Sequence, residues 1–207
     1  GGQETYNDVT FNHDVNGNYN IQILDGGNTF GDVKFIPLNQ KQININDNNT
    51  YNSVNIEVNN NNVSTTTNVN VNGTNTFGSF TLLSPGTAGP FLYFHEDNNF
   101  GSFTSAGQGT RVFLGSNKTQ YVNAFTLLGT GGFPAFLQST STGTQADIQK
   151  DSGDVCLDYV WVKDIDATGG ATFNAGASSQ DLGNNAGWNF NSCSGYYWVG
   201  NSGNWSD

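Results

Sequence analysis

The sequence predicts an all-β protein, a right-handed parallel β-helix (β-solenoid) with coils of about 21–26 residues. Three observations predict this fold. One short motif recurs along most of the chain, apolar and polar residues alternate inside each copy, and glycine-containing steps separate the copies. The composition agrees, because Gly, Asn, Thr and Ser are abundant and Met is absent, a mixture that disfavours helix interiors.

The recurring motif has the form Thr-aromatic-x-x-apolar-x-apolar. Copies begin at Thr5-Tyr6, Thr29-Phe30, Thr50-Tyr51 and Thr76-Phe77, and fainter ones begin at Asn99-Phe100 and Gln120-Tyr121. The six aromatic positions are 24, 21, 26, 23 and 21 residues apart, which suits one turn of a solenoid and is too short for a propeller blade. We therefore predict an internal stack with one ring per coil, made by Tyr6, Phe30, Tyr51, Phe77, Phe100 and Tyr121.

Alternation within the copies indicates strands with one face inward, as in Phe80-Thr81-Leu82. Each coil also has a second apolar patch, such as Ile43 with Ile45, so two or three strands per turn are expected. One extra residue between Tyr121 and Phe125 suggests a β-bulge. Steps such as Gly26-Gly27, Asn72-Gly73 and Pro85-Gly86 supply the positive φ that corners need.

Asparagines recur at equivalent places in successive coils. Asn44, Asn46, Asn55 and Asn70 are candidates either for side-chain amide ladders or for solvated surface positions. The alternative fold is an antiparallel β-sandwich, which also has short strands separated by frequent turns. A sandwich, however, gives no reason for an aromatic residue to recur at the same place in the motif every 21–26 residues.

Length and charge limit the partners. The 207 residues suit one elongated domain. The chain has 6 Lys and Arg but 17 Asp and Glu, which gives a net charge of −11. It therefore has little basic surface that could bind phosphate backbones, and we expect no nucleic-acid partner. No apolar run approaches the roughly 18 residues of a membrane helix, so we expect no membrane insertion.

The sequence changes character after residue 126. It contains TLLGTGG (126–132), CLDYVWVKDIDATGG (156–170), GNNAGWNF (183–190) and YWVGNSGNWSD (197–207). These segments resemble the β-helix modules of very large cell-surface adhesins that gliding Bacteroidota export through the type IX secretion pathway. The last segment resembles the opening of a further module. The Asn-rich N-terminal part departs from this pattern and shares only the architecture.

The resemblance implies a structural or adhesive module of a large bacterial protein that is secreted to the cell surface and acts in adhesion or gliding. It implies no catalytic residue, so we expect a protein that is not an enzyme. Residues 1–193 would form the β-helix module, and residues 194–207 a linker or the start of the next tandem module. The implied partners are neighbouring modules of the same polypeptide and, at the cell surface, polysaccharides or other glycans.

Cys156 and Cys193 are the only cysteines, an even number that is consistent with an exported protein. A disulfide between them would close a span of 37 positions (193 − 156), which is worth about 4 kcal/mol in the chain-entropy model. Such a bond would pin the tail over the last coil, whose edge is otherwise open. The alternative is two buried free thiols.

The four tryptophans define a second functional hypothesis, a carbohydrate-binding module. Trp161, Trp188, Trp198 and Trp205 would stack on sugar rings if they are exposed, and would fill a core or a cap if they are not. A third hypothesis is a β-helix polysaccharide lyase or hydrolase, which needs paired carboxylates or a basic group beside them.

Few side chains suit such catalysis. Arg111 is the sole arginine, His13 and His95 are the only histidines, and the adjacent carboxylates of Glu96 and Asp97 would point to opposite faces of a strand. Five aspartates lie close together in the sequence and are candidates either for calcium ligation or for capping turns: Asp151, Asp154, Asp158, Asp164 and Asp166. No known calcium-loop spacing is present, so we expect no cofactor.

Overall fold

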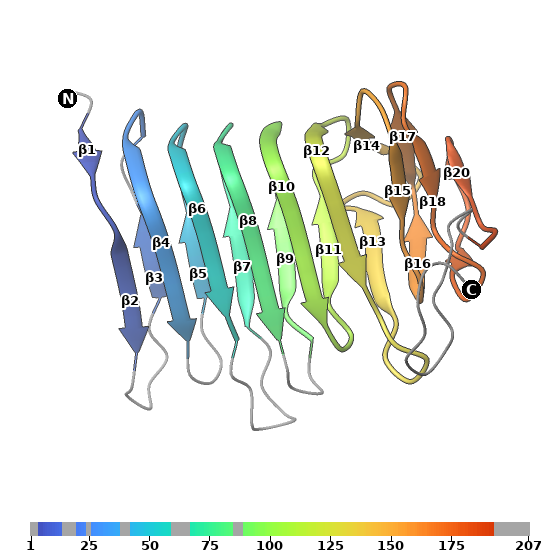
Figure 1. Cartoon of the computed structure of the whole chain (residues 1–207), viewed down its shortest axis with the longest axis horizontal. Helices are drawn as coiled ribbons and strands as arrows, with labels where there is room; N and C mark the ends of the chain where they lie inside the picture. Colours follow the sequence, from blue (N-terminus) through green and yellow to red (C-terminus); the bar gives the residue numbers. More distant parts are fainter. Residues whose placement is uncertain are drawn as a thin grey trace, which may run out of the picture.

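The computed structural model of the chain describes residues 4–13, 20–23, 26–37, 42–58, 67–84 and 89–192. These residues form twenty β-strands and no helix, and every pairing between the strands is parallel. In Figure 1 the front strands point downward, the rear strands point upward, and the chain advances from left to right, which makes the coil right-handed. The predicted parallel β-helix is confirmed, and the antiparallel sandwich is excluded.

Three sheets form the walls of the helix. Sheet A contains β1 (Thr5–Tyr6), β2 (Val9–His13), β4 (Thr29–Pro37), β6 (Thr50–Glu57), β8 (Thr76–Ser84), β10 (Asn98–Gly107), β12 (Thr119–Leu128), β14 (Ala146–Gln149) and β17 (Ile165–Thr168). Sheet B contains β3 (Asn20–Ile23), β5 (Gln42–Ile45), β7 (Asn68–Val71), β9 (Phe91–Phe94), β11 (Arg111–Leu114), β13 (Ala135–Ser139), β16 (Val160–Lys163) and β19 (Gln180–Asp181). Sheet C contains β15 (Asp154–Cys156), β18 (Thr172–Asn174) and β20 (Trp188–Asn189).

The predicted ring stack runs through the interior of the first coils. Tyr6, Phe30, Tyr51, Phe77 and Phe100 lie one over another, with successive ring centroids 5.0, 5.0, 5.2 and 5.1 Å apart and nearly parallel planes. Tyr6 lies in the first described coil and is 40% exposed, whereas Tyr51, between two coils, is 1% exposed. Parallel pairing in register places equivalent side chains directly above each other, which is why the repeat in the sequence becomes a stack in space.

The prediction that Tyr121 continues this stack is wrong. Phe100 pairs with Val122, which is 4% exposed, whereas Tyr121 points outward and is 41% exposed. The suggested bulge is absent, because β10 and β12 pair with no extra residue on either strand. Phe100 lies three positions before the buried Phe103, and Val122 lies three positions before Phe125. The inward residue is therefore identified by its distance from the next buried phenylalanine, and not by being aromatic itself.

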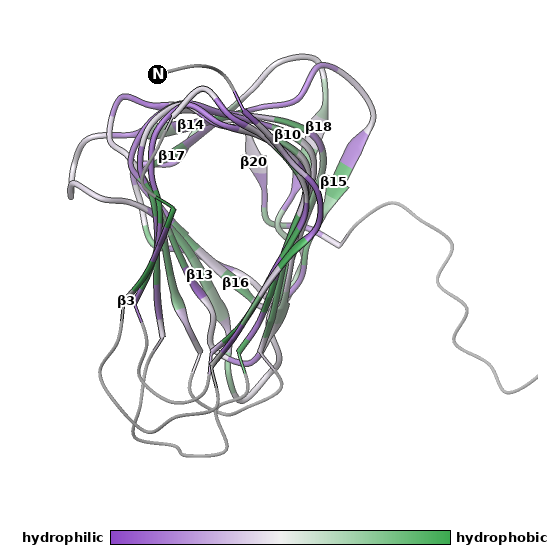
Figure 2. Ribbon diagram, turned by 90° about the vertical axis from the view of Figure 1, so that its left-hand side faces the viewer, coloured by the Kyte–Doolittle hydropathy of each residue, from purple (hydrophilic) through white to green (hydrophobic). Residues whose placement is uncertain are grey.

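Each long strand of sheet A bends just after its stacked residue, and glycine occupies this position in several coils. A Cβ on Gly78 would lie 2.4 Å from the carbonyl oxygen of Asn52, and a Cβ on Gly101 would lie 2.3 Å from that of Gly78. The bend turns one strand into two walls of the coil. Seen end-on in Figure 2, the ribbons enclose a single interior.

A row of buried amides lines one corner of the interior. Asn28, Asn49, Asn75, Asn98 and Gln120 form this inner ladder, and their exposed fractions lie between 0 and 6%. The backbone N–H of each of the first three donates to the side-chain oxygen of the next, at 2.9, 3.0 and 2.9 Å. The Asn98 amide donates to Gln120 at 3.1 Å. These bonds satisfy polar groups that water cannot reach.

The amide positions predicted from the sequence have a mixed outcome. Asn70 donates to Asn44 at 3.1 Å and Asn72 donates to Asn46 at 2.7 Å, so amide ladders do form between these coils. Asn55 donates instead to a serine hydroxyl of its own strand. The inner ladder was not predicted, because nothing local in the sequence separates an inward asparagine from an exposed one.

The described part of the module ends at residue 192. The predicted domain boundary between residues 193 and 194 lies outside the described residues, and so does Cys193. Cys156 lies on β15 with its side chain outward and exposed, which excludes the alternative of a buried thiol at this position. The Cys156–Cys193 disulfide stays a prediction. Among the described residues, no helix is long and apolar enough to cross a bilayer.

Candidate functional site

The outer face of sheet B carries a patch of aromatic side chains, which we call the aromatic platform. Strands β9, β11, β13 and β16, on the far side of the rod in Figure 1, supply it. The alternate residues of these strands point inward and are 0 to 5% exposed, so the platform residues point away from the core. The platform consists of Phe91, Tyr93, Arg111, Phe113, Phe136 and Trp161.

Strand register orders the platform into two rows along the helix axis. In the first row Phe91 pairs with Arg111, Arg111 with Phe136, and Phe136 with Trp161. The Arg111 guanidinium carbon lies 4.7 Å from the ring centroid of Phe136 and 5.3 Å from that of Phe91, which are cation–π distances. The rings of Phe136 and Trp161 meet edge to face at 4.9 Å.

The second row begins with a stacked pair. The Tyr93 and Phe113 rings lie 4.6 Å apart with an interplanar angle of 12°. Gln138 and Lys163 continue the row on β13 and β16. The imidazole of His95 stacks on Tyr93 at 5.9 Å and is exposed. Each ring is partly covered by its neighbours, so the rows are held in fixed positions by mutual contact.

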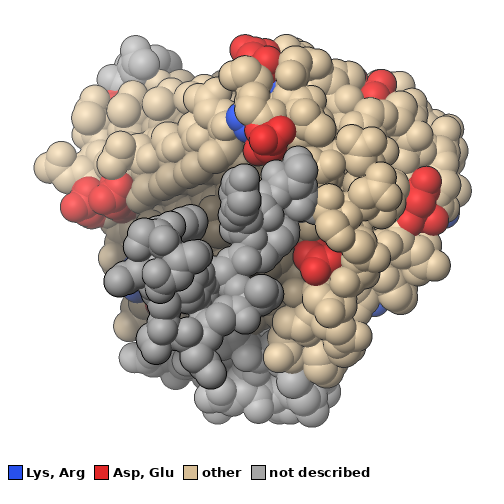
Figure 3. Space-filling model, turned by 45° about the vertical axis from the view of Figure 1, so that its right-hand side comes forward, with Lys and Arg blue, Asp and Glu red and all other residues tan. Residues whose placement is uncertain are grey.

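The platform differs in charge from the rest of the molecule. None of the seven sheet B strands from β3 to β16 contains an Asp or Glu, although the chain has a net charge of −11. Arg111 and Lys163 lie on this face. On the view in Figure 3, by contrast, acidic groups are spread over the surface and basic groups are few. The platform is therefore a cationic and aromatic area on an acidic protein.

Several donors of the platform have no partner among the described residues. The two ion pairs among the described residues are Lys34–Glu57 and Lys118–Glu96, and Arg111 belongs to neither. No hydrogen bond joins the guanidinium of Arg111, the hydroxyl of Tyr93 or the indole nitrogen of Trp161 to another described residue. These groups are not buried either, so their hydrogen-bonding capacity faces solvent.

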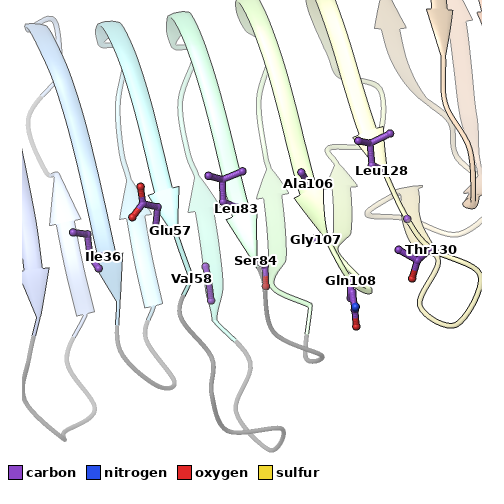
Figure 4. Close-up of a pocket in the computed structure, with 11 residues that line it drawn as sticks. Ile36, Glu57, Val58, Leu83, Ser84, Ala106, Gly107, Gln108, Leu128 and Thr130 are labelled. Atoms are coloured by element: carbon purple, nitrogen blue, oxygen red, sulfur yellow. The ribbon is translucent and has the colours of Figure 1, made fainter. Parts of the chain in front are cut away.

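A second surface feature is an apolar groove of about 680 Å³ at the ends of the sheet A strands. Figure 4 shows Ile36, Leu83, Ala106 and Leu128 in a row across these strands. Leu83 and Leu128 are 39% and 44% exposed. The titratable residue in the groove lining is Glu57, whose carboxylate forms an ion pair with Lys34 at 2.7 Å. The groove therefore offers apolar contact and no pair of catalytic groups.

The predicted tryptophan contacts separate into three cases. Trp161 belongs to the aromatic platform. Trp188 is half-buried: it packs edge-on against Phe173 at 5.3 Å, and its indole nitrogen is buried without a partner among the described residues. Trp198 and Trp205 lie outside the described residues. The platform residues other than Trp161 were not predicted, since their meeting depends on strand register.

The carboxylates considered for catalysis hold corners of the coil. Asp97 accepts the backbone N–H of Thr119 at 2.7 Å, and Glu96 forms an ion pair with Lys118. The hydrogen bond from Lys118 to Glu96 raises the pKa of that lysine. Both contacts are structural, as expected for acidic residues at a turn.

One further carboxylate has a shifted pKa. Burial raises the pKa of Asp147, and the neighbouring charge of Asp166, which pairs with it in register, raises it further. The Thr119 hydroxyl donates to Asp147 at 3.4 Å. This pair lies outside the lining of the groove and outside the platform.

Two of the aspartates considered for calcium accept hydrogen bonds that hold neighbouring turns. Asp158 accepts the N–H groups of Tyr159 and Ser178, each at 3.1 Å. Asp164 is 2% exposed and accepts the amide of Asn184 at 2.7 Å. The described residues contain no group of three His, Cys, Asp or Glu side chains placed to hold a metal ion. The remaining three, Asp151, Asp154 and Asp166, therefore take part in no such group.

Comparison with protein-family models, with curated proteins and with solved structures gave no match.

Proposed function

We propose that this chain is a non-enzymatic structural and adhesive module of a large secreted bacterial cell-surface protein, in which a rigid β-helical rod presents the aromatic platform to a partner surface. The observation that carries the proposal is the platform itself. Its rings and unpaired donors are gathered on one face, where they contribute nothing to the core, and clusters of this kind on a soluble protein mark interaction sites.

The interior supports the role of a rigid spacer. Aromatic stacking, the inner ladder and continuous parallel pairing tie each coil to the next. Such a rod resists bending, and its length grows by about 4.8 Å with each added coil. A rigid rod keeps an outer face at a defined distance and orientation, which is what an adhesive unit in a long surface protein requires.

Location and partners are proposed from the sequence. The segments after residue 126 resemble modules of type IX-secreted adhesins of gliding Bacteroidota, and the two cysteines suit an oxidising environment. We therefore place the module at the extracellular cell surface, with neighbouring modules of the same polypeptide at its ends and surface glycans as candidate partners on its face.

Adhesion under flow tests this proposal. Particles coated with the protein are passed over surfaces that carry polysaccharide, protein or an apolar polymer, and the retained fraction is counted. We expect retention on at least one surface, and a loss of at least half of it in a Phe113→Ala/Trp161→Ala double variant. A Leu83→Ala/Leu128→Ala double variant, which alters the groove, is the matched control. Retention that depends on the groove variant and not on the platform variant would contradict the proposal.

A further inference from the structure

We propose that the aromatic platform binds an acidic polysaccharide, with the sugar chain lying along the helix axis and its anionic groups against Arg111 and Lys163. This inference rests on the proposed function, because it assumes that the platform is the contact surface, and it adds the chemical class of the ligand. Three features of the platform lead to this class.

The first feature is periodicity. The rows cross four parallel strands, so equivalent contact points recur about every 4.8 Å along the helix axis and extend over about 14 Å. A compact ligand uses a concave pocket, whereas a repeating polymer matches a row of repeated contact points. Sheet B forms one wall of the rod in Figure 2, and the row runs along the stacked strands.

The second feature is the mixture of ring faces and donors. A sugar ring has an apolar C–H face and an edge of hydroxyl groups. Phe113 and Trp161 offer aromatic surface to the face, while Tyr93, Trp161 and Gln138 offer hydrogen-bonding groups to the edge. A purely apolar ligand would leave these donors without partners, at a cost in affinity.

The third feature is charge. Arg111 lies in the middle of the first row and has no ion-pair partner in the described part of the chain, and its guanidinium is held between the rings of Phe91 and Phe136. A guanidinium fixed in this way binds a carboxylate or sulfate with two parallel hydrogen bonds. Sheet B from β3 to β16 contributes no carboxylate that would repel such a group. The platform is thus selective for an anionic sugar over a neutral one.

Single-stranded nucleic acid also combines stacking faces with negative charge. It carries a phosphate at every nucleotide, and a chain with 6 Lys and Arg and a net charge of −11 repels such a density of charge. An acidic polysaccharide with spaced charges and abundant hydroxyl groups matches two cations among neutral donors better.

The test is isothermal titration of the whole chain with hyaluronan, whose carboxylates lie on every second sugar, with a neutral β-glucan and with an oligo-dT strand. We expect binding to hyaluronan, weaker binding to the neutral glucan, and none to oligo-dT. Arg111→Gln should weaken hyaluronan binding at least about tenfold while changing β-glucan binding little, because it removes a charge-assisted contact. Phe113→Ala should weaken both by about three- to tenfold, because it removes a stacking face.

Lys34→Gln is the matched control, since it removes a cation that pairs with Glu57 on sheet A, away from the platform, and should leave every affinity within about twofold. Thermal unfolding shows that each variant is folded. Equal affinity for acidic and neutral chains with no effect of Arg111→Gln would overturn the inference, as would tighter binding to oligo-dT. If adhesion under flow depends on the platform but no glycan binds in the titration, only the inference is overturned. If the protein neither adheres through the platform nor binds a glycan, the proposed function is overturned as well.

Discussion

The coils before residue 129 and those after it close the same solenoid in different ways. Before it, each coil from β4 onward has two strands, and the long strand of sheet A forms two walls by bending at a position such as Gly78. After it, two coils have three short strands each, β13 to β15 and β16 to β18, and sheet C forms the third wall. Strand β12 joins the two regions, because its first residues pair with β14 and its last, Leu128, bridges to Asp158.

The interiors differ more than the corners. Residues in the left-handed region turn corners in both regions, at Gly27 (φ 80°) and Asp47 (φ 64°) in the early coils and at Tyr159 (φ 52°) and Gly169 (φ 96°) in the later ones. The early coils hold a stack of rings, whereas the later ones hold aliphatic side chains, one buried phenylalanine and four buried alanines: Ala135, Ala146, Ala167 and Ala175. The same kind of corner therefore serves both regions, and the size of the inward side chains distinguishes them.

The largest expected effect lies in the early coils. Phe77 is fully buried between two stacked rings, so Phe77→Ala should lower the free energy of unfolding by about 3–5 kcal/mol in chemical denaturation. The matched control is Phe133→Ala, at a position that is 41% exposed, which should cost less than about 0.5 kcal/mol. Equal costs for the two variants would show that the ring stack does not stabilise these coils.

The second prediction concerns the later coils, whose small side chains bury less apolar surface. If Cys156 and Cys193 form the predicted disulfide, the Cys156→Ser/Cys193→Ser double variant should lose up to about 4 kcal/mol of stability. Hydrogen exchange should then rise in β18 and β20 more than in β6 and β8. Alkylation of two thiols in the unreduced, denatured protein would rule out the bond.

A third, smaller effect compares inner and outer amides. Asn75→Ala leaves the backbone N–H of Asn49 and two carbonyl groups without partners in a buried corner, at an expected cost of about 1–3 kcal/mol. Asn70→Ala removes a partly exposed amide whose acceptor, the side-chain oxygen of Asn44, keeps a second donor in Gln42, and should cost less than about 1 kcal/mol. Denaturation midpoints with unchanged slopes check this ordering, and a reversed ordering would contradict the role of the inner ladder.

The smallest effect concerns the later part of sheet A and depends on pH. Because folding raises the pKa of Asp147, its contribution to stability is complete below the ordinary value of 3.8 and is lost as pH rises through the raised pKa. Asp147→Asn should therefore be more stable than the parent at neutral pH, by a few tenths of a kcal/mol for this half-buried group. The difference should vanish in melts below pH 3.8, and a difference that grows on acidification would contradict the assigned shift.

The repeat made the fold predictable, and the candidate site was predictable only in part. Parallel pairing preserves the phase of the motif, so five of the six rings were placed correctly from spacing alone. Tyr121 was misplaced because its aromatic character outweighed the spacing that points to Val122. Trp161 was named as a glycan contact, but Arg111 was considered only for catalysis, since a single sequence does not show that its neighbours are aromatic.

By itself the sequence determined the period, the parallel coil and the inward face of most strands, because alternation and phase are local properties that stacking merely repeats. Tertiary structure alone decided which amides line the buried corner and which side chains meet on the outer face of sheet B. These contacts join residues some twenty or more positions apart in the sequence. The register that brings them together is set by the lengths of the corners between the strands, and no local sequence pattern reveals those lengths.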